Sequence, residues 1–119
     1  MANPNIVGVT SILGKTQGGE ITTGLNTMLT NSVGSNAIYK INSLIVSNID
    51  GINAADVTAV ARVDGADIRI ASTITVPADA TLVVISKETS IYLEENDSIK
   101  LQASANGDLH YVLSYEIIS

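Results

Sequence analysis

Short runs in which apolar and polar residues alternate follow one another along most of the chain. The clearest is residues 109–118, LHYVLSYEII, where an apolar residue recurs at every second position. This period is typical of a β-strand with one buried face. The same alternation, or a short apolar run, predicts further strands over residues 37–49, 56–63, 72–76, 81–86, 90–94 and 98–104.

Turn residues separate these runs. Asp64-Gly65 predicts a tight hairpin, because both residues tolerate positive φ. A short helix capped by Asn53 is an alternative for 56–63, but valine, threonine and the hairpin that follows favour a strand. Short strands, frequent turns and no clear helix predict an all-β, single-domain β-sandwich of the jelly-roll kind.

Residues 37–49 have apolar residues at both odd and even positions. Tyr39, Ile41 and Ile45 would lie on one face of this strand, whereas Leu44 and Val46 would lie on the other. We therefore expect the centre of this strand to be covered on both sides.

The first 36 residues differ from the rest, since they hold six of the nine glycines and only two charged residues, Lys15 and Glu20. Residues 1–36 are either an extended N-terminal arm that pairs with a neighbour's sheet edge or the first edge strands of the sandwich, whose body is 37–119. Apolar residues of this segment are the candidate interface residues: Ile6, Val7, Val9, Ile12, Leu13, Leu25, Met28 and Leu29.

Composition removes several classes of function. The chain has 119 residues, no cysteine, no phenylalanine or tryptophan, and a net charge of −6. Its six lysines and arginines are scattered, so no basic patch predicts nucleic-acid binding. No apolar run is long enough for a membrane span, and the opening MANPNIVGVTSILGK has no signal-peptide pattern. Without cysteine, disulfides and thiolate metal sites are excluded.

The acidic cluster Glu94, Glu95 and Asp97 is the strongest candidate for chemistry. Calcium takes six to eight oxygen ligands, usually from several loops, and three acids supply at most half of that number. A strand corner explains the same residues, with Asn96 in a left-handed turn and Asp97 accepting backbone N–H groups. We therefore expect a corner here, and these three acids are the only metal ligands that we would consider.

No other constellation predicts catalysis. The single histidine, His110, is expected on the strand face opposite Tyr111 and Tyr115, and no nucleophile is paired with it in the sequence. Asp50 and Asp56 do not have the spacing of a calcium loop, and Gly14-Lys15-Thr16 lacks the glycines of a phosphate loop. We expect no enzyme activity and no cofactor.

The order of the motifs SLIVSN, DG, VPADATLVVIS, SIYLEENDSIKLQASA and VLSYE, from Ile38 onward, resembles small virion structural proteins of tailed bacteriophages, especially those of marine cyanobacteria. The opening MANPNIVGVTSILGKT resembles the start of the same family. The resemblance implies a β-sandwich on the phage particle, often a trimer, made in the host cytoplasm.

Three functions follow for testing. The first is a capsid decoration or cement protein that binds the phage major capsid protein, or another virion protein, and stabilises the shell. The second is a tail, neck or fibre component of the virion. The third belongs to another class, a carbohydrate- or calcium-binding β-sandwich module. Either virion function predicts a homo-oligomer, with the trimer favoured, and no nucleic-acid or membrane partner.

Overall fold

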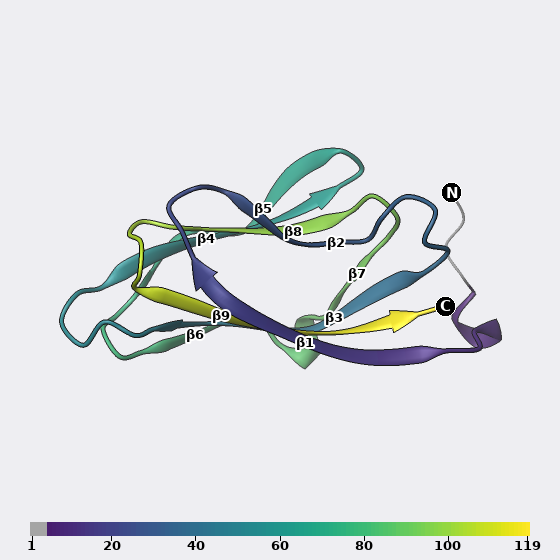
Figure 1. Ribbon diagram of the computed structural model, residues 1–119, viewed down its shortest axis with the longest axis horizontal. Helices are drawn as coiled ribbons and strands as arrows, with labels where there is room; N and C mark the ends of the chain where they lie inside the picture. The colour runs from purple at the N-terminus through teal and green to yellow at the C-terminus, as the bar shows by residue number, and fades with distance from the viewer. Residues whose placement is uncertain (1–4) are drawn as a thin grey trace.

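The computed structural model describes residues 5–119, which form two antiparallel sheets packed face to face (Figure 1). Residues 1–4, which belong to the opening stretch quoted above, lie outside the described residues. The described part measures 50 × 24 × 20 Å and has no α-helix, only the 3-10 turns η1 (Ile6–Gly8) and η2 (Lys87–Thr89). The predicted all-β sandwich is confirmed.

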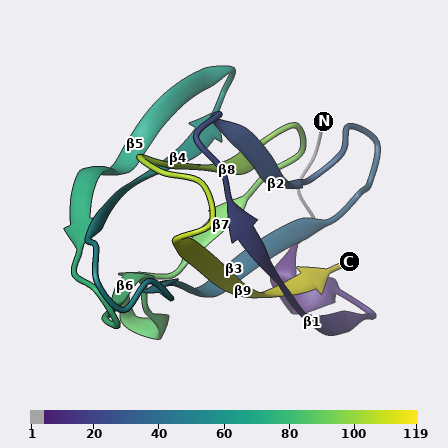
Figure 2. The same cartoon turned by 60° about the vertical axis from the view of Figure 1, so that its left-hand side comes forward.

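The nine strands of the described residues divide between the sheets in a jelly-roll order. The first sheet has the order β1-β9-β3-β6, with β7 also paired to β3, and the second has the order β2-β8-β4-β5 (Figure 2). The strands of the first sheet are β1 (Ile12–Ile21), β9 (Leu109–Ile118), β3 (Ile38–Asn48), β6 (Thr81–Ile85) and β7 (Ile91–Leu93). Those of the second are β2 (Asn26–Thr30), β8 (Ser98–Ala103), β4 (Ala55–Val63) and β5 (Ala66–Val76).

The core lies between the two inner faces and is built from aliphatic side chains. Leu44, Val57, Leu101 and Leu113 are fully buried there. Strand β9 buries every second residue over most of its length, as its sequence alternation predicts. Towards one end, the rings of Tyr39 and Tyr115 stack with centroids 5.8 Å apart, which fills a space that phenylalanine or tryptophan often fills elsewhere.

The odd- and even-numbered apolar residues of β3 are not buried on opposite faces of its sheet, so the prediction that this strand is covered on both sides is wrong. The pairing of β3 with β9 changes register between Ile41 and Ser43, which leaves Asn42 as an extra residue. This β-bulge reverses the side-chain alternation. Ile41, Leu44 and Val46 are therefore all fully buried in the core, and Ile45 is half-buried on the outer face.

The predicted hairpin is present between β4 and β5. Asp64 and Gly65 have φ values of 52° and 79°, the left-handed conformation that a two-residue hairpin turn needs. Residues 56–63 are a strand, as predicted, within β4. The strand expected at 72–76 is the end of the longer β5, whose pairing with β4 shifts register twice before the strand ends.

Candidate assembly interface

Among residues 5–119, strand β1 is an edge strand that pairs with β9 alone. It lies antiparallel to β9 in unbroken register from Ile12 opposite Ile118 to Ile21 opposite Leu109. Just before it, Ser11 and Ser119 exchange both backbone hydrogen bonds, at 3.0 and 2.9 Å. Because hydrogen-bonded and non-hydrogen-bonded pairs alternate in an antiparallel ladder, this pair fixes the direction of every later backbone group.

The even-numbered residues of β1 point their backbone groups away from the sheet. Ser11 is hydrogen-bonded to β9, so the odd positions that follow it also face β9, and the even positions face outward. Each outward residue presents one N–H and one C=O along the free edge. These residues are Ile12, Gly14, Thr16, Gly18 and Glu20.

Side-chain contacts hold β1 firmly in this register. The Thr16 and Ser114 hydroxyls lie 3.2 Å apart on the outer face. On the inner face, the Gln17 amide donates to the Met28 carbonyl of β2 at 2.7 Å and to the Tyr111 hydroxyl at 3.1 Å. Gln17 thereby ties the edge strand of one sheet to the edge strand of the other.

Gly18 allows β1 to approach β9 closely. A Cβ atom at Gly18 would lie 2.8 Å from the backbone carbonyl oxygen of Tyr111, closer than real Cβ contacts come. A Cβ atom at Gly14 would meet nothing within 4 Å. The two glycines therefore differ in role, since Gly18 is required by packing and Gly14 keeps the outer edge free of side chains.

The other sheet edges of residues 5–119 are short or irregular. Strand β2 has five residues and a register shift after Thr27, and β6 has five residues and a shift in its pairing with β3. Strand β7 has three residues, and β5 carries two shifts and Thr73 at a φ of 47°. Bulges and short strands are how natural proteins protect sheet edges. Among these edges, β1 alone is both long and regular.

The candidate interface residues are divided between surface and core. Val7 is 95% exposed, and Leu29 is 9% exposed within the core of its own chain. Met28 packs against that core and Val9 is half-buried. The remaining candidates are exposed: Ile6, Ile12, Leu13 and Leu25. An interface at this end of the chain would therefore use residues 6–13 more than residues 28–29.

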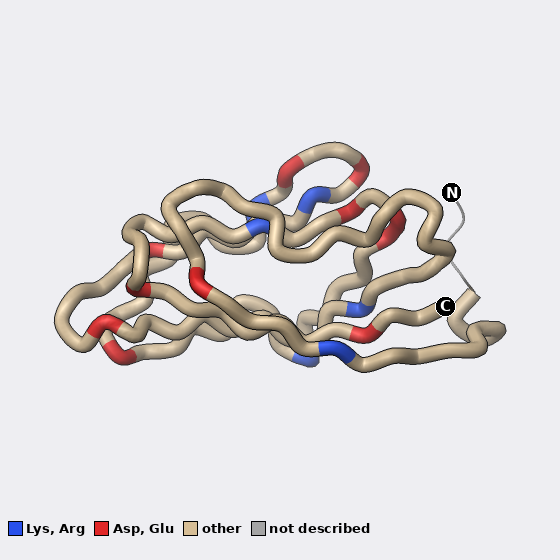
Figure 3. The backbone as a smooth tube through the Cα atoms, in the orientation of Figure 1, with Lys and Arg blue, Asp and Glu red and all other residues tan. Residues whose placement is uncertain are grey.

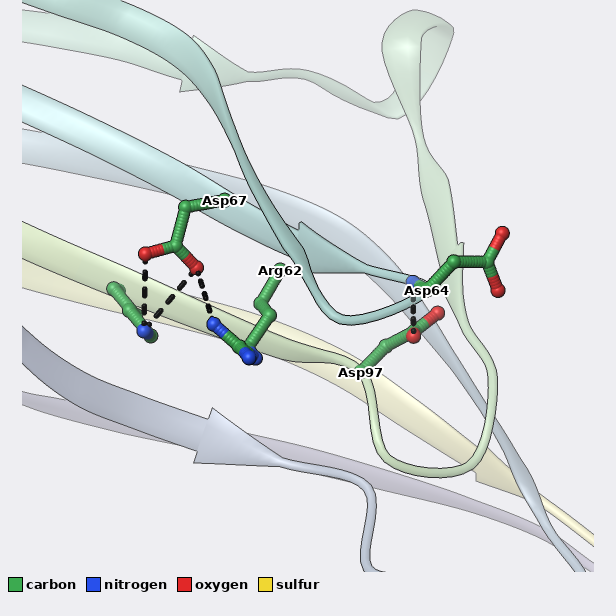
Figure 4. Close-up of polar contacts among 5 residues, drawn as sticks. Arg62, Asp64, Asp67 and Asp97 are labelled. Atoms are coloured by element: carbon green, nitrogen blue, oxygen red, sulfur yellow. Dashed lines mark hydrogen bonds and ion pairs between the residues drawn. The ribbon is translucent and has the colours of Figure 1, made fainter.

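The acidic cluster forms the corner between β7 and β8. Asn96 has a φ of 73°, the left-handed turn residue that was predicted. Asp97 is buried, and its carboxylate accepts the N–H groups of Glu94 at 3.1 Å and Asp64 at 3.4 Å, the second of which joins the corner to the hairpin (Figure 4). Glu95 Oε1 accepts the Gly34 N–H at 2.6 Å, and its Oε2 is buried without a hydrogen-bond partner. Within residues 5–119, no three His, Asp or Glu side chains are placed to hold a metal ion.

Two buried asparagines, which no sequence pattern indicated, connect segments that lie far apart along the chain. Asn31 is fully buried, and its amide donates to the carbonyl oxygens of Ala37 and Leu93, both at 2.9 Å. Asn48, 3% exposed, donates in the same way to Asn53 and Val76, also at 2.9 Å. Each side chain donates to one carbonyl in a loop, that of Ala37 or Asn53, and to one at the end of a strand, that of Leu93 or Val76.

Charges lie mostly in the loops and in the β4–β5 hairpin, and few lie along β1 (Figure 3). In the hairpin, the Asp67 carboxylate contacts Lys100 Nζ at 3.2 Å and Arg62 Nη1 at 3.1 Å (Figure 4). The hydrogen bond from Lys100, with a further one from Arg62, lowers the pKa of Asp67. The pKa of Asp50 is also lowered, chiefly by the backbone N–H groups of Ile52 and Asn53.

The remaining candidates for chemistry lie apart from one another. His110 is exposed, while Tyr111 and Tyr115 of the same strand are buried on the opposite face, as predicted. Asp56 lines a hollow of about 210 Å³ with five other residues, smaller than the pockets that usually hold ligands. Asp56 accepts a hydrogen bond from Thr75, whereas Asp50 lies in the separate turn after β3. Among the described residues, no helix has the length and apolar character needed to cross a membrane.

Comparison with known proteins gives a likeness in fold. No protein-family description matches the sequence, and no curated protein does. Among solved structures, one from Bacillus endospore appendages, described as a novel family of disulfide-linked pili, is similar with a TM-score of 0.52 and 14% sequence identity. The match covers 99% of this chain and 94% of that chain. At this identity the likeness establishes a shared β-sandwich fold over nearly the whole of both chains.

Proposed function

We propose that this chain is a non-enzymatic structural subunit that assembles with copies of itself through the free edge of β1. The observation that carries the proposal is the ten-residue strand whose outward backbone groups lie in unbroken register. A regular, exposed edge is a ready template for another strand, and most natural sheets protect such edges. Exposed Ile12 and Leu13 at the start of this edge add apolar surface to the contact.

The likeness to an appendage subunit supports a structural role. That structure comes from pili described as disulfide-linked. The present chain has no cysteine, so disulfides cannot link its copies. Backbone hydrogen bonds along a sheet edge, together with apolar contacts, are interactions that such a chain can use.

We place this subunit in the particle of a tailed bacteriophage, on the strength of the motifs between Ile38 and Glu116 that resemble virion proteins. Within the particle, a fibre, tail or neck component is favoured over a capsid decoration protein, because the similar fold is that of a pilus subunit. Cryo-electron microscopy of the particle tests the location: density for this chain on the shell lattice would support decoration instead.

Replacing Gly14 by proline tests the role of the β1 edge. Gly14 directs its N–H outward, so proline removes a donor for a partner strand without removing a bond to β9. Gly14→Ala is the matched control, because it keeps the N–H and its Cβ meets nothing within 4 Å. We expect both variants to fold, by circular dichroism, and only Gly14→Pro to lose self-association in light scattering. Unchanged association of a folded Gly14→Pro would refute the proposal.

A further inference from the structure

We infer that the strand which pairs with β1 is β1 of a second copy, in an antiparallel, two-fold symmetric arrangement. This inference rests on the proposed function and names its partner. A partner for β1 needs a free edge of similar length and regular hydrogen bonding. Within residues 5–119, the other edge strands carry a register shift or have only three residues, which leaves β1 itself as the matching edge.

The hydrogen-bond pattern of β1 is self-complementary. Two strands related by a two-fold axis perpendicular to their shared sheet pair residues i and j whose sum is even, because their side chains then lie on the same face. The outward groups of β1 belong to even positions, so even residues of one copy meet even residues of the other. An edge whose outward backbone groups belonged partly to even and partly to odd positions could not pair with a second copy of itself in this way.

One register uses every outward residue of the edge. With Thr16 opposite Thr16 of the second copy, Gly14 lies opposite Gly18 and Ile12 opposite Glu20, and each relation occurs twice. All five outward residues of each copy then pair within β1. Shifting one strand by two residues is the smallest change that still pairs even positions with even positions. It places Ile12 opposite Thr22, which lies beyond the end of β1.

Charge also favours approach along this edge. Each copy has a net charge of −6, and eleven of the twelve acids follow residue 36, so most surfaces of two copies repel. In the proposed register Lys15 lies opposite Gln17 and Glu20 opposite Ile12, so no like charges face each other directly. Gly14 and Gly18, which lie opposite each other in this register, leave the outer-face positions on either side of Thr16 without side chains.

Single cysteines in this cysteine-free chain test the pairing directly. Thr16 would lie on the two-fold axis, where hydrogen-bonded pairs have Cα atoms about 5.5 Å apart, within the range of a disulfide. Gly14→Cys is the matched control, on the same strand and the same face but away from the axis. Under mild oxidation of the full chain, we expect Thr16→Cys to form a covalent dimer in most molecules and Gly14→Cys to stay at background.

The outcomes separate this inference from the proposed function. Self-association that Gly14→Pro abolishes, without a cross-link in folded Thr16→Cys, would mean that β1 pairs with another edge or protein, and would overturn the two-fold pairing alone. A single chain at every concentration would overturn both proposals. If Thr16→Cys does not fold, the mass of the unaltered chain decides: two chains support the pairing, whereas one or three refute it.

Discussion

Replacing Gly18 by alanine would place a methyl carbon 2.8 Å from the Tyr111 carbonyl oxygen and 3.6 Å from the Val112 side chain. The carbonyl belongs to the backbone of β9, which is paired on both sides, so it cannot easily move away. Strand β1 has to shift outward instead, which strains its hydrogen bonds to β9. The backbone at Gly18 is not left-handed, so the contact rather than φ determines the effect.

The size of this effect follows from two opposing terms. Overpacking at a site that cannot relax costs about 1–3 kcal/mol. Alanine also restricts the unfolded chain, which stabilises the folded state by about 0.4–1 kcal/mol. At Gly18 both terms apply, whereas at Gly14 only the second does, because its Cβ meets nothing. We therefore expect Gly18→Ala to be about 2 kcal/mol less stable than Gly14→Ala.

Urea unfolding of the two variants measures this difference. Both should be compared at one chain concentration, because self-association stabilises the folded state. A difference of about 2 kcal/mol separates the midpoints by roughly 1 M urea for a domain of this size. Equal midpoints, or a more stable Gly18→Ala, would mean that β1 is not held against β9 in the register described here.

Further predictions concern the polar groups. Asn31→Ala should lower the free energy of unfolding by roughly 2–3 kcal/mol in urea titrations, because it removes two buried hydrogen bonds, to the Ala37 and Leu93 carbonyls. Exposed Asn26→Ala should change it by less than about 0.5 kcal/mol. The pKa of Asp50 is lower in the folded protein than its usual 3.8, so its stabilising effect is present above that pH and is lost as pH falls through the folded pKa. Melting temperature should therefore begin to fall as pH drops below about 4, and Asp50→Asn should make that fall smaller. Calcium should leave the melting temperature unchanged, because Asp97 already accepts two N–H groups; a saturable rise would contradict the corner interpretation.

Local patterns predicted most of the strands, because alternation and turn residues act within a few positions. Strand β9 and the Asp64-Gly65 turn are present as expected. The bulge at Asn42 was not predictable, since nothing in the sequence around it distinguishes an extra residue from a regular one. The faces of Leu44 and Ile45 relative to Ile41 were therefore predicted wrongly.

The candidate interface depended on information that no local pattern holds. Residues 12–21 have β-forming sequence, but their status as a free edge follows from pairing with β9, about a hundred positions away. The difference between Gly14 and Gly18 likewise appears only when the Tyr111 carbonyl is placed opposite the strand. Of the apolar residues of the first segment that were predicted to form an interface, Leu29 belongs to the core of its own chain.

The pairing of β1 with β9 also determines how late in synthesis β1 can find its partner within the chain. Strand β1 leaves the ribosome well before its partner β9, so it stays unpaired on both sides until residues 109–118 have been made. Domains dominated by such distant pairings fold slowly, and unpaired strands are prone to aggregation while they wait. Chains crowded on one messenger would meet each other's β1 before their own β9 exists, so the edge suited to assembly is also the part of the nascent chain in most need of protection.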